Sequence, residues 1–321
     1  MAIVVIDDQG KAEHQASAGE IRQKLDAGEF IWVDVAEPDQ HDHELLASTI
    51  CMDEEDAVEA LRMHQRPRIV DLSDELAMIV LYGVTDRRRN PVELHVLVSE
   101  HFVVTIHDAA ISGLAALQSR HRLQEKDKPV AALVVVHKIL DSIADAYFPR
   151  LSKIDDEIDK VEEGIFQNPT DEQLQQLFAM KRELIGMRKV ITPMRDMLGA
   201  VFTGVVELPG FTAETSGWLR DAYDHMIRIS DLVDSYRDLL TGAMDVYLST
   251  VSNRLNSVMK QLTVIATIFF PLTFVTGFFG QNFSFLVNWI GNTWAFWVFA
   301  IGLELAIVLG MMWLFRRRKW V

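Results

Sequence analysis

The chain has 321 residues, with 46 acidic against 31 basic side chains and a formal net charge of −15. Only four basic residues and one glutamate follow Lys260, so the first 260 residues carry a charge of −18. This acidic body argues against nucleic-acid binding, because phosphates are bound by lysine and arginine, whereas it is compatible with cations or with plain solubility. The single cysteine, Cys51, excludes internal disulfides and a thiolate-rich zinc site.

The N-terminal part, residues 1–110, predicts a cytoplasmic α/β domain. We expect, in chain order, a helix at 17–28 opened by Ser17, a buried strand at 30–35, an acidic helix-like stretch at 37–64, and strands at 76–84, 92–98 and 102–107. The first thirty residues are otherwise polar and weakly patterned, without the basic start of a signal peptide. The domain contains no glycine-rich phosphate loop or nucleophile elbow, so no enzyme is indicated. His41 and His43 flank Asp42, but side chains at i and i+2 of a helix point apart, which favours a surface position over a metal site.

Residues 111–215 predict a helical hairpin. The stretch 130–166 keeps apolar side chains at i, i+3, i+4 and i+7, with acidic side chains opposite. Asn168-Pro169-Thr170 breaks this helix, and residues 171–203 form its antiparallel partner before a linker.

A very long helix is expected over 216–280, beginning at Ser216 and ending at Gly280. At 1.5 Å per residue it is roughly 95 Å long, well beyond the thickness of a membrane, so it predicts a cytoplasmic stalk that continues into the bilayer.

Two membrane spans are expected in the 43 consecutive uncharged residues between Lys260 and Glu304, since a spanning helix needs about 20 apolar residues. In order, we expect a first span at about 261–279, an extracellular loop at 281–292, a second span at 293–315 and a basic tail at 316–321. Basic flanks stay inside, so both termini are expected in the cytoplasm of a cell-membrane protein, and the tail also suits anionic lipid.

The long helix carries a heptad stripe of small, polar and acidic side chains, where an ordinary coiled coil is apolar. The stripe comprises Asp221, Asp224, Arg228, Asp231, Ser235, Asp238, Gly242, Asp245, Ser249, Ser252, Asn256, Met259, Thr263, Ala266, Phe270, Thr273 and Gly277. In the cytoplasm these acids are compatible with a simple solvated face. Within a bilayer, hydroxyl and amide groups are unlikely to face lipid. Several copies of the helix around an axis would form a cation pathway with carboxylates at its entrance and constrictions at Met259 and Phe270.

The segment 247–277, followed by Gly280-Gln281-Asn282, closely resembles the CorA family of divalent-metal channels. His64-Gln65-Arg66-Pro67-Arg68 and Arg220-Asp221 also look like family positions. The resemblance implies an α+β membrane protein that forms a homopentameric funnel, with an N-terminal α/β domain, a helical hairpin, a stalk helix and two transmembrane helices per subunit. Five first spans line the pore, and Gly280, Gln281 and Asn282 replace the family's Gly-Met-Asn selectivity filter. The zinc-transporting ZntB branch also departs from that motif.

The resemblance further implies closure of the channel by cytoplasmic Mg²⁺ bound between subunits, at positions matching Glu59 and Asp221. Asp224, Asp231 and Asp238 are further candidate ligands in the stalk. Glu304 lies within the second span, where a carboxyl group is costly and often functional, as a proton relay or as a structural partner.

These patterns predict a pentameric channel for Mg²⁺ influx driven by the membrane potential, with Co²⁺ or Ni²⁺ also admitted. Membrane lipid and metal ions are the expected partners, and no organic cofactor or nucleic acid is expected. One alternative is a proton-coupled, ZntB-like Zn²⁺ transporter. Another is a membrane-anchored sensor or scaffold that conducts no ion.

Overall fold

The computed structural model describes residues 2–7, 12–14, 17–38, 54–86, 88–119, 132–206, 208–209, 216–281, 284, 288, 293–318 and 320. They form two compact units, Met1–Met244 and Asp245–Val321. His41, Asp42 and His43, for which the sequence favours a surface position over a metal site, lie outside the described residues, as do Cys51 and Asn282.

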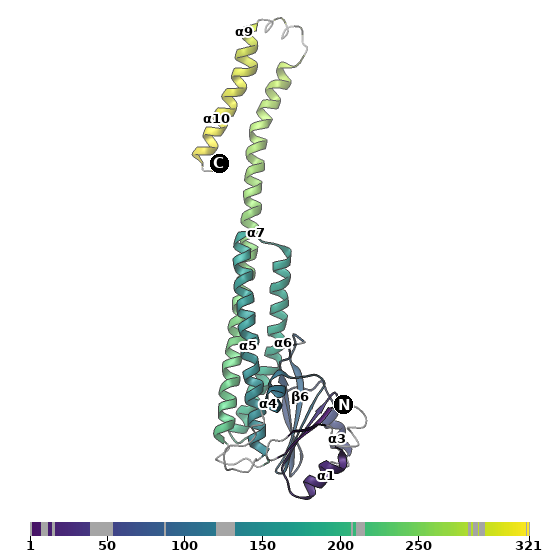
Figure 1. Cartoon of the computed structure of the whole chain (residues 1–321). Helices are drawn as coiled ribbons and strands as arrows, with labels where there is room; N and C mark the ends of the chain where they lie inside the picture. The colour runs from purple at the N-terminus through teal and green to yellow at the C-terminus, as the bar shows by residue number, and fades with distance from the viewer. Residues whose placement is uncertain are drawn as a thin grey trace. The chain divides into compact units, whose positions relative to one another are not determined.

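A seven-stranded sheet in the order β2-β1-β3-β7-β6-β5-β4 forms the N-terminal part of the first unit (Figure 1). Its strands are β1 (Ala2–Asp7), β2 (Ala12–His14), β3 (Ile31–Ala36), β4 (Arg68–Ser73), β5 (Leu76–Gly83), β6 (Val92–Ser99) and β7 (Phe102–His107). β3 and β7 are parallel, and the neighbouring pairs on both sides are antiparallel. The four strands expected from the sequence correspond to β3, β5, β6 and β7, whereas β1, β2 and β4 were not predicted.

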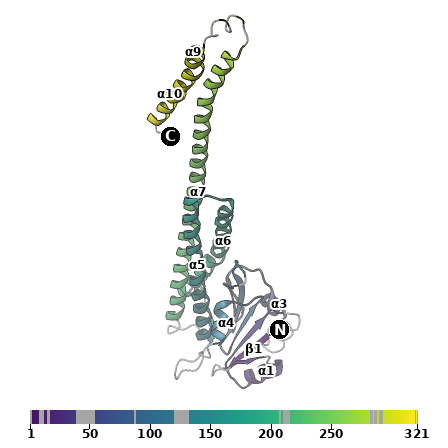
Figure 2. The ribbon, with the colours of Figure 1, turned by 45° about the horizontal axis from the view of Figure 1, so that its top comes forward.

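Helices cover both faces of the sheet (Figure 2). On one face, α1 (Ala18–Asp26) and α3 (Glu54–Leu61) bury Ile21, Ala57 and Ala60 against strand residues such as Val33 and Val104. On the other face, the buried Tyr147 of the long helix α5 (Ala132–Gln167) donates its hydroxyl proton to the carbonyl of Tyr82 in β5 at 2.9 Å. The short helix α4 (Ser112–Ser119) packs beside α5.

Local capping explains where the predicted helices start. Ser17 caps α1 as expected: its hydroxyl accepts the N–H of Glu20 at 3.4 Å, and the Glu20 carboxylate accepts the N–H of Ser17 at 2.7 Å. Thr170 and Gln173 form the same reciprocal pair at the start of α6.

Three long helices complete the first unit. α5 (Ala132–Gln167) and α6 (Asp171–Phe202) are the two arms of the predicted hairpin, and α7 (Ser216–Phe279) is one continuous helix, as expected. Up to Met244, α7 packs along the hairpin through an apolar stripe. This buried stripe comprises Leu219, Ala222, Met226, Ile229, Val233, Leu240 and Ala243.

The second unit contains the rest of α7, followed by α9 (Thr293–Ala295), a π-helix η1 (Phe296–Gly302) and α10 (Leu303–Arg317). Two helical segments, Gly217–Phe279 and Phe296–Arg317, are long and apolar enough to cross a membrane by length and composition. The sequence predicted a second transmembrane helix at 293–315. Part of this segment is the wider π-helix η1, which ends at Gly302, two residues before Glu304.

Candidate ion pathway and regulatory site

The acidic part of the predicted stripe lies on the solvent-exposed side of α7. Asp221, Asp224, Asp231 and Asp238 are all exposed, as expected for positions on the side of a 3.6-residue helix away from its buried apolar stripe. The structure therefore places the predicted stalk acids on one open face of the first unit.

The stripe continues in the second unit along the same helix. Asp245, Ser249, Ser252, Asn256, Met259, Thr263, Phe270, Thr273 and Gly277 are exposed, and Ala266 is half-buried. Every residue from 252 to 263 is exposed in the single chain, so exposure alone does not distinguish a pore-facing side from a side that faces other helices or lipid. The assignment of these residues to a pore stays a prediction.

The threonines of the first span share one hydrogen-bond arrangement. Thr263, Thr273 and Thr276 each donate the hydroxyl proton to the carbonyl four residues earlier, at 2.7, 2.9 and 2.9 Å. A hydroxyl has one proton, so the oxygen then offers only lone pairs to other groups. Such oxygens suit the water protons of a hydrated cation.

The predicted filter follows directly on the end of α7. The N–H of Gly280 donates to the carbonyl of Thr276 at 2.9 Å, and that of Gln281 donates to the carbonyl of Phe278 at 3.3 Å. A Cβ atom at position 280 would lie 3.0 Å from the Thr276 carbonyl oxygen, so the helix end favours glycine there. Gln281 is exposed.

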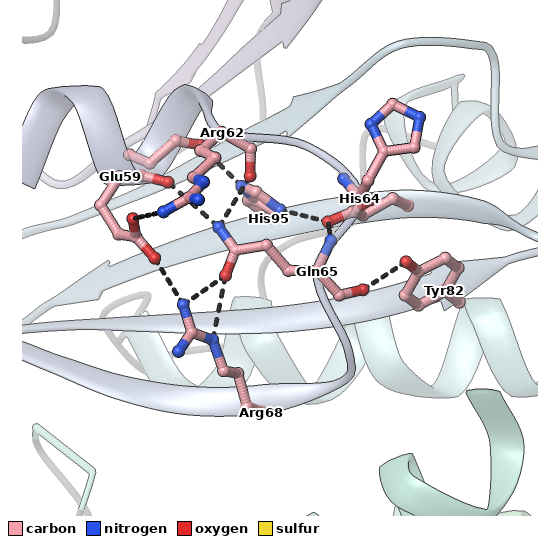
Figure 3. Close-up of polar contacts among 9 residues, drawn as sticks. Glu59, Arg62, His64, Gln65, Arg68, Tyr82 and His95 are labelled. Atoms are coloured by element: carbon pink, nitrogen blue, oxygen red, sulfur yellow. Dashed lines mark hydrogen bonds and ion pairs between the residues drawn. The ribbon is translucent and has the colours of Figure 1, made fainter. Parts of the chain in front are cut away.

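The segment His64–Arg68 is anchored to the sheet by a buried carboxylate (Figure 3). Glu93 of β6 accepts the backbone N–H groups of His64 at 2.6 Å and of Gln65 at 2.9 Å, and lies 2.8 Å from Nε2 of His95. Burial by itself would raise the pKa of Glu93, but the hydrogen bonds from His95, Gln65 and His64 outweigh it and lower that pKa. The backbone of His64 adopts a left-handed conformation (φ 72°), so the chain turns sharply where it is tied down.

Glu59, a predicted regulatory ligand, is already paired within its own chain. Its carboxylate lies 2.5 Å from Nη2 of Arg68 and 3.6 Å from Nη1 of Arg62 (Figure 3). A metal ion at Glu59 would therefore have to displace a guanidinium group. Asp221 is exposed and suits a hard cation better, since its carboxylate faces solvent. The single chain does not bring these two residues together in a shared cluster of ligands.

A different group of side chains, of types that can hold a metal ion, was not predicted from the sequence. Asp141 and Asp145 of α5 and His225 of α7 place ligand atoms within 4.8 Å of one another. The i, i+4 spacing of the two aspartates was visible in the sequence. The third residue is distant in the chain and is brought in only by the packing of α7 on α5.

Glu304 lies in the first turn of α10, directly after the π-helix, and is half-buried. A carboxyl group within an apolar segment is costly and often functional, so a role for Glu304 in transport stays a prediction.

Comparisons with known proteins agree on the family. The model of the family described as "CorA-like Mg²⁺ transporter protein" matches residues 27–317. The cobalt/magnesium transport protein CorA of Thermotoga maritima is 33% identical over 81% of this chain and 74% of its own length. The zinc transport protein ZntB of Cronobacter sakazakii is 24% identical over 80% of this chain and 77% of its own length.

The fold agrees as well. The complete structure of the CorA magnesium transporter from Methanocaldococcus jannaschii superposes with a TM-score of 0.83 over 100% of this chain and 99% of the other, at 22% identity. Members of the family are transporters of divalent cations and not enzymes, in agreement with the interpretation of the sequence. The chain belongs to the CorA-like Mg²⁺ transporter family.

Proposed function

We propose that the chain forms a homopentameric channel in the cell membrane that carries Mg²⁺ inward along the membrane potential and also admits Co²⁺ or Ni²⁺. The observation that carries this proposal is the continuity of α7, which joins exposed carboxylates to a hydroxyl- and amide-bearing apolar span without a break. Carboxylates gather cations, and oxygen-bearing side chains replace or hold their water. The relative from Thermotoga maritima is named for cobalt and magnesium transport, which supports the same cargo here.

The surface of the second unit supports its burial in a membrane assembly. Phe269 and Phe274, which lie outside the predicted pore stripe, are 62 and 73% exposed in the single chain, which water does not favour. Lipid and neighbouring subunits cover such residues, and around a five-fold axis the polar stripe faces inward. The three consecutive arginines after the second span keep both termini in the cytoplasm.

Gating in this proposal uses Mg²⁺ bound between the stalks of adjacent subunits. The metal ligands are the exposed carboxylates of Asp221, Asp224, Asp231 and Asp238. When the ion is lost, the like charges of these carboxylates repel one another and the stalks open. Glu59 contributes only if Arg68 releases it, so Arg68 competes with the ion.

The experiment is ion uptake into proteoliposomes with an imposed membrane potential. Wild-type protein takes up Mg²⁺, Asn282→Ala abolishes the uptake because the filter amide is lost, and Asn288→Ala in the same loop serves as the matched control. Unchanged flux in both Asn282→Ala and Asp245→Ala would instead support a sensor or scaffold that conducts no ion.

A second candidate is a ZntB-like, proton-coupled Zn²⁺ transporter. Two observations favour it: Gln281 stands in the filter, and a zinc transport protein is among the relatives. Uptake of Zn²⁺ that follows an imposed pH gradient, with little Mg²⁺ entry, would establish this alternative. The same gradient applied to Glu304→Gln would then test that carboxyl group as the proton carrier.

A further inference from the structure

A groove between α6 and α7 carries positive charge on the otherwise acidic first unit. The groove encloses about 580 Å³ and is lined by Ile185, Arg188, Lys189, Thr192, Pro193 and Arg237. Binding sites for small molecules commonly have volumes of about 300–1,000 Å³. All six lining residues belong to the first unit, so the groove lies within one compact part of the chain.

One carboxylate orients both arginines of the groove. Oδ1 of Asp234 in α7 lies 2.8 Å from Nε of Arg188 in α6 and 2.9 Å from Nη1 of Arg237. Each contact uses one nitrogen of a guanidinium group, so the other N–H groups of both arginines are available to a ligand. Guanidinium groups donate hydrogen bonds in a fixed fork, which matches an anion with several oxygens, above all a phosphate.

The balance of charge in the groove favours an anion. Arg188, Lys189 and Arg237 supply three positive charges, and Asp234 supplies one negative charge. Arg188 and Lys189 are exposed, so a ligand reaches them from solvent. Glu183 of α6 does not reduce this charge at the surface, because it is buried and paired with an arginine of α5.

The uncharged part of the groove suits the organic body of such a ligand. Ile185 is 39% exposed and lies beside the cations, together with the half-buried Pro193. Proline has no N–H, so the carbonyl of Lys189, four residues before Pro193, lacks its helical donor. A hydroxyl group of a ligand can donate to this carbonyl, and the half-buried hydroxyl of Thr192 offers a further polar contact.

We propose that the groove binds a small phosphorylated molecule that also carries hydroxyl groups, of the nucleotide or sugar-phosphate class. Arg188, Lys189 and Arg237 hold the phosphate, and the apolar wall with the carbonyl of Lys189 holds the organic part. The ligand contacts α6 and α7 together, so it ties the hairpin to the long helix. The site uses none of the predicted metal ligands or pore residues, and its occupancy does not depend on whether the chain conducts Mg²⁺.

The test is calorimetric titration of the purified full-length protein in detergent with AMP. EDTA is present, so that no divalent ion on the stalk carboxylates can bridge to the phosphate. Wild type binds AMP under these conditions. Inorganic phosphate binds more weakly, because it cannot use the apolar wall, and adenosine, which has no phosphate, does not bind.

Arg188→Gln and Arg237→Gln each weaken the affinity for AMP by at least about tenfold, because each removes charge-assisted hydrogen bonds to the phosphate. The matched control is Arg182→Gln, which removes an exposed positive charge from the same helix outside the groove and leaves the affinity unchanged. The side chain of Arg188 is 51% exposed, so Arg188→Gln is expected to fold normally even if Arg237→Gln does not.

Three results overturn the proposal: no binding of AMP to wild type, an equal loss of affinity in Arg182→Gln, or equal affinities for AMP and inorganic phosphate. If AMP does not bind and Arg188→Gln instead weakens the association of subunits, the groove is a contact with a second copy of the chain.

Discussion

Two buried carboxylates in the sheet each face a buried histidine. His95 lies 2.8 Å from Glu93 within β6, and His107 of β7 lies 3.2 Å from Asp34 of β3. A buried carboxylate without a polar partner is costly, so each histidine provides its carboxylate with such a partner. The first pair holds the His64–Arg68 segment, and the second joins the two parallel strands.

The pair of His107 and Asp34 makes stability depend on pH. Burial by itself would lower the pKa of His107, but the hydrogen bond and negative charge of Asp34 outweigh it and raise that pKa above its ordinary value of 6.5. A raised pKa in the folded state stabilises the protein fully below the unfolded value. This stabilisation is lost as the pH rises through the folded value.

We therefore predict that Asp34→Asn lowers the unfolding midpoint of the purified protein most below about pH 6.5, where His107 is charged in both states, and progressively less above it. Thermal unfolding in detergent at a series of pH values measures the difference from wild type. Asp74→Asn, at an exposed turn, is the control and changes the midpoint little at any pH. A difference between wild type and Asp34→Asn that grows with rising pH would contradict this account.

At the scale of the elements, α4 and α5 approach so closely that only glycine fits between them. A Cβ atom on Gly113 would lie 2.2 Å from the backbone carbonyl oxygen of Ser142, which no side-chain rotation can relieve. Gly113→Ala is therefore expected to push α4 from α5 and to cost about 1–3 kcal/mol in the free energy of unfolding.

The matched control for this prediction is Gly19→Ala in α1. A Cβ atom there meets nothing within 4 Å, and alanine favours the helix, so this change is expected to be neutral or stabilising by up to about 1 kcal/mol. Chemical denaturation of the detergent-solubilised protein measures both variants. If Gly113→Ala changed the free energy of unfolding no more than Gly19→Ala does, α4 would move away from α5 without measurable destabilisation, which would contradict the prediction.

Some helices and strands could be predicted from the sequence, and others could not. α1, α5, α6 and α7 could be predicted because their apolar spacing runs over several turns and Ser17 or Asn168-Pro169-Thr170 marks an end. β2 and β4 could not be predicted in this way, because both are edge strands. β2 has only three residues, and β4 has no buried residue but only exposed and half-buried ones.

Candidate site residues also divide into those that a local sequence pattern indicates and those that only tertiary packing brings together. The stripe of α7 is local, so its seven-residue repeat from Asp224 to Gly277 can be recognised from the sequence of one segment alone. The pairing of Glu59 with Arg68, and the approach of His225 to Asp141, join elements through tertiary packing. Such contacts have no signature in the spacing of one segment, which is why Glu59 was interpreted as a metal ligand without its arginine.

At the scale of the whole molecule, α7 is the covalent link between the first unit and the apolar second unit. The same helix that packs against the hairpin also carries Asp245 and the first candidate membrane-spanning segment. In the proposed pentamer, Asp245 forms the last ring of carboxylates before the hydroxyl-bearing part of the stripe.

Charge at that ring raises the local concentration of cations, and dissolved salt screens its field over about 8 Å at physiological ionic strength. Asp245→Asn is therefore expected to reduce Mg²⁺ flux several-fold in proteoliposomes at low ionic strength and only slightly at high ionic strength. Asp159→Asn, which removes an exposed acid from α5, serves as the control for net charge. If Asp245→Asn reduced flux by the same factor at all salt concentrations, the carboxylate would act by direct coordination of the ion. If it left flux unchanged throughout, the cytoplasmic end of the pathway would lie elsewhere on the molecule.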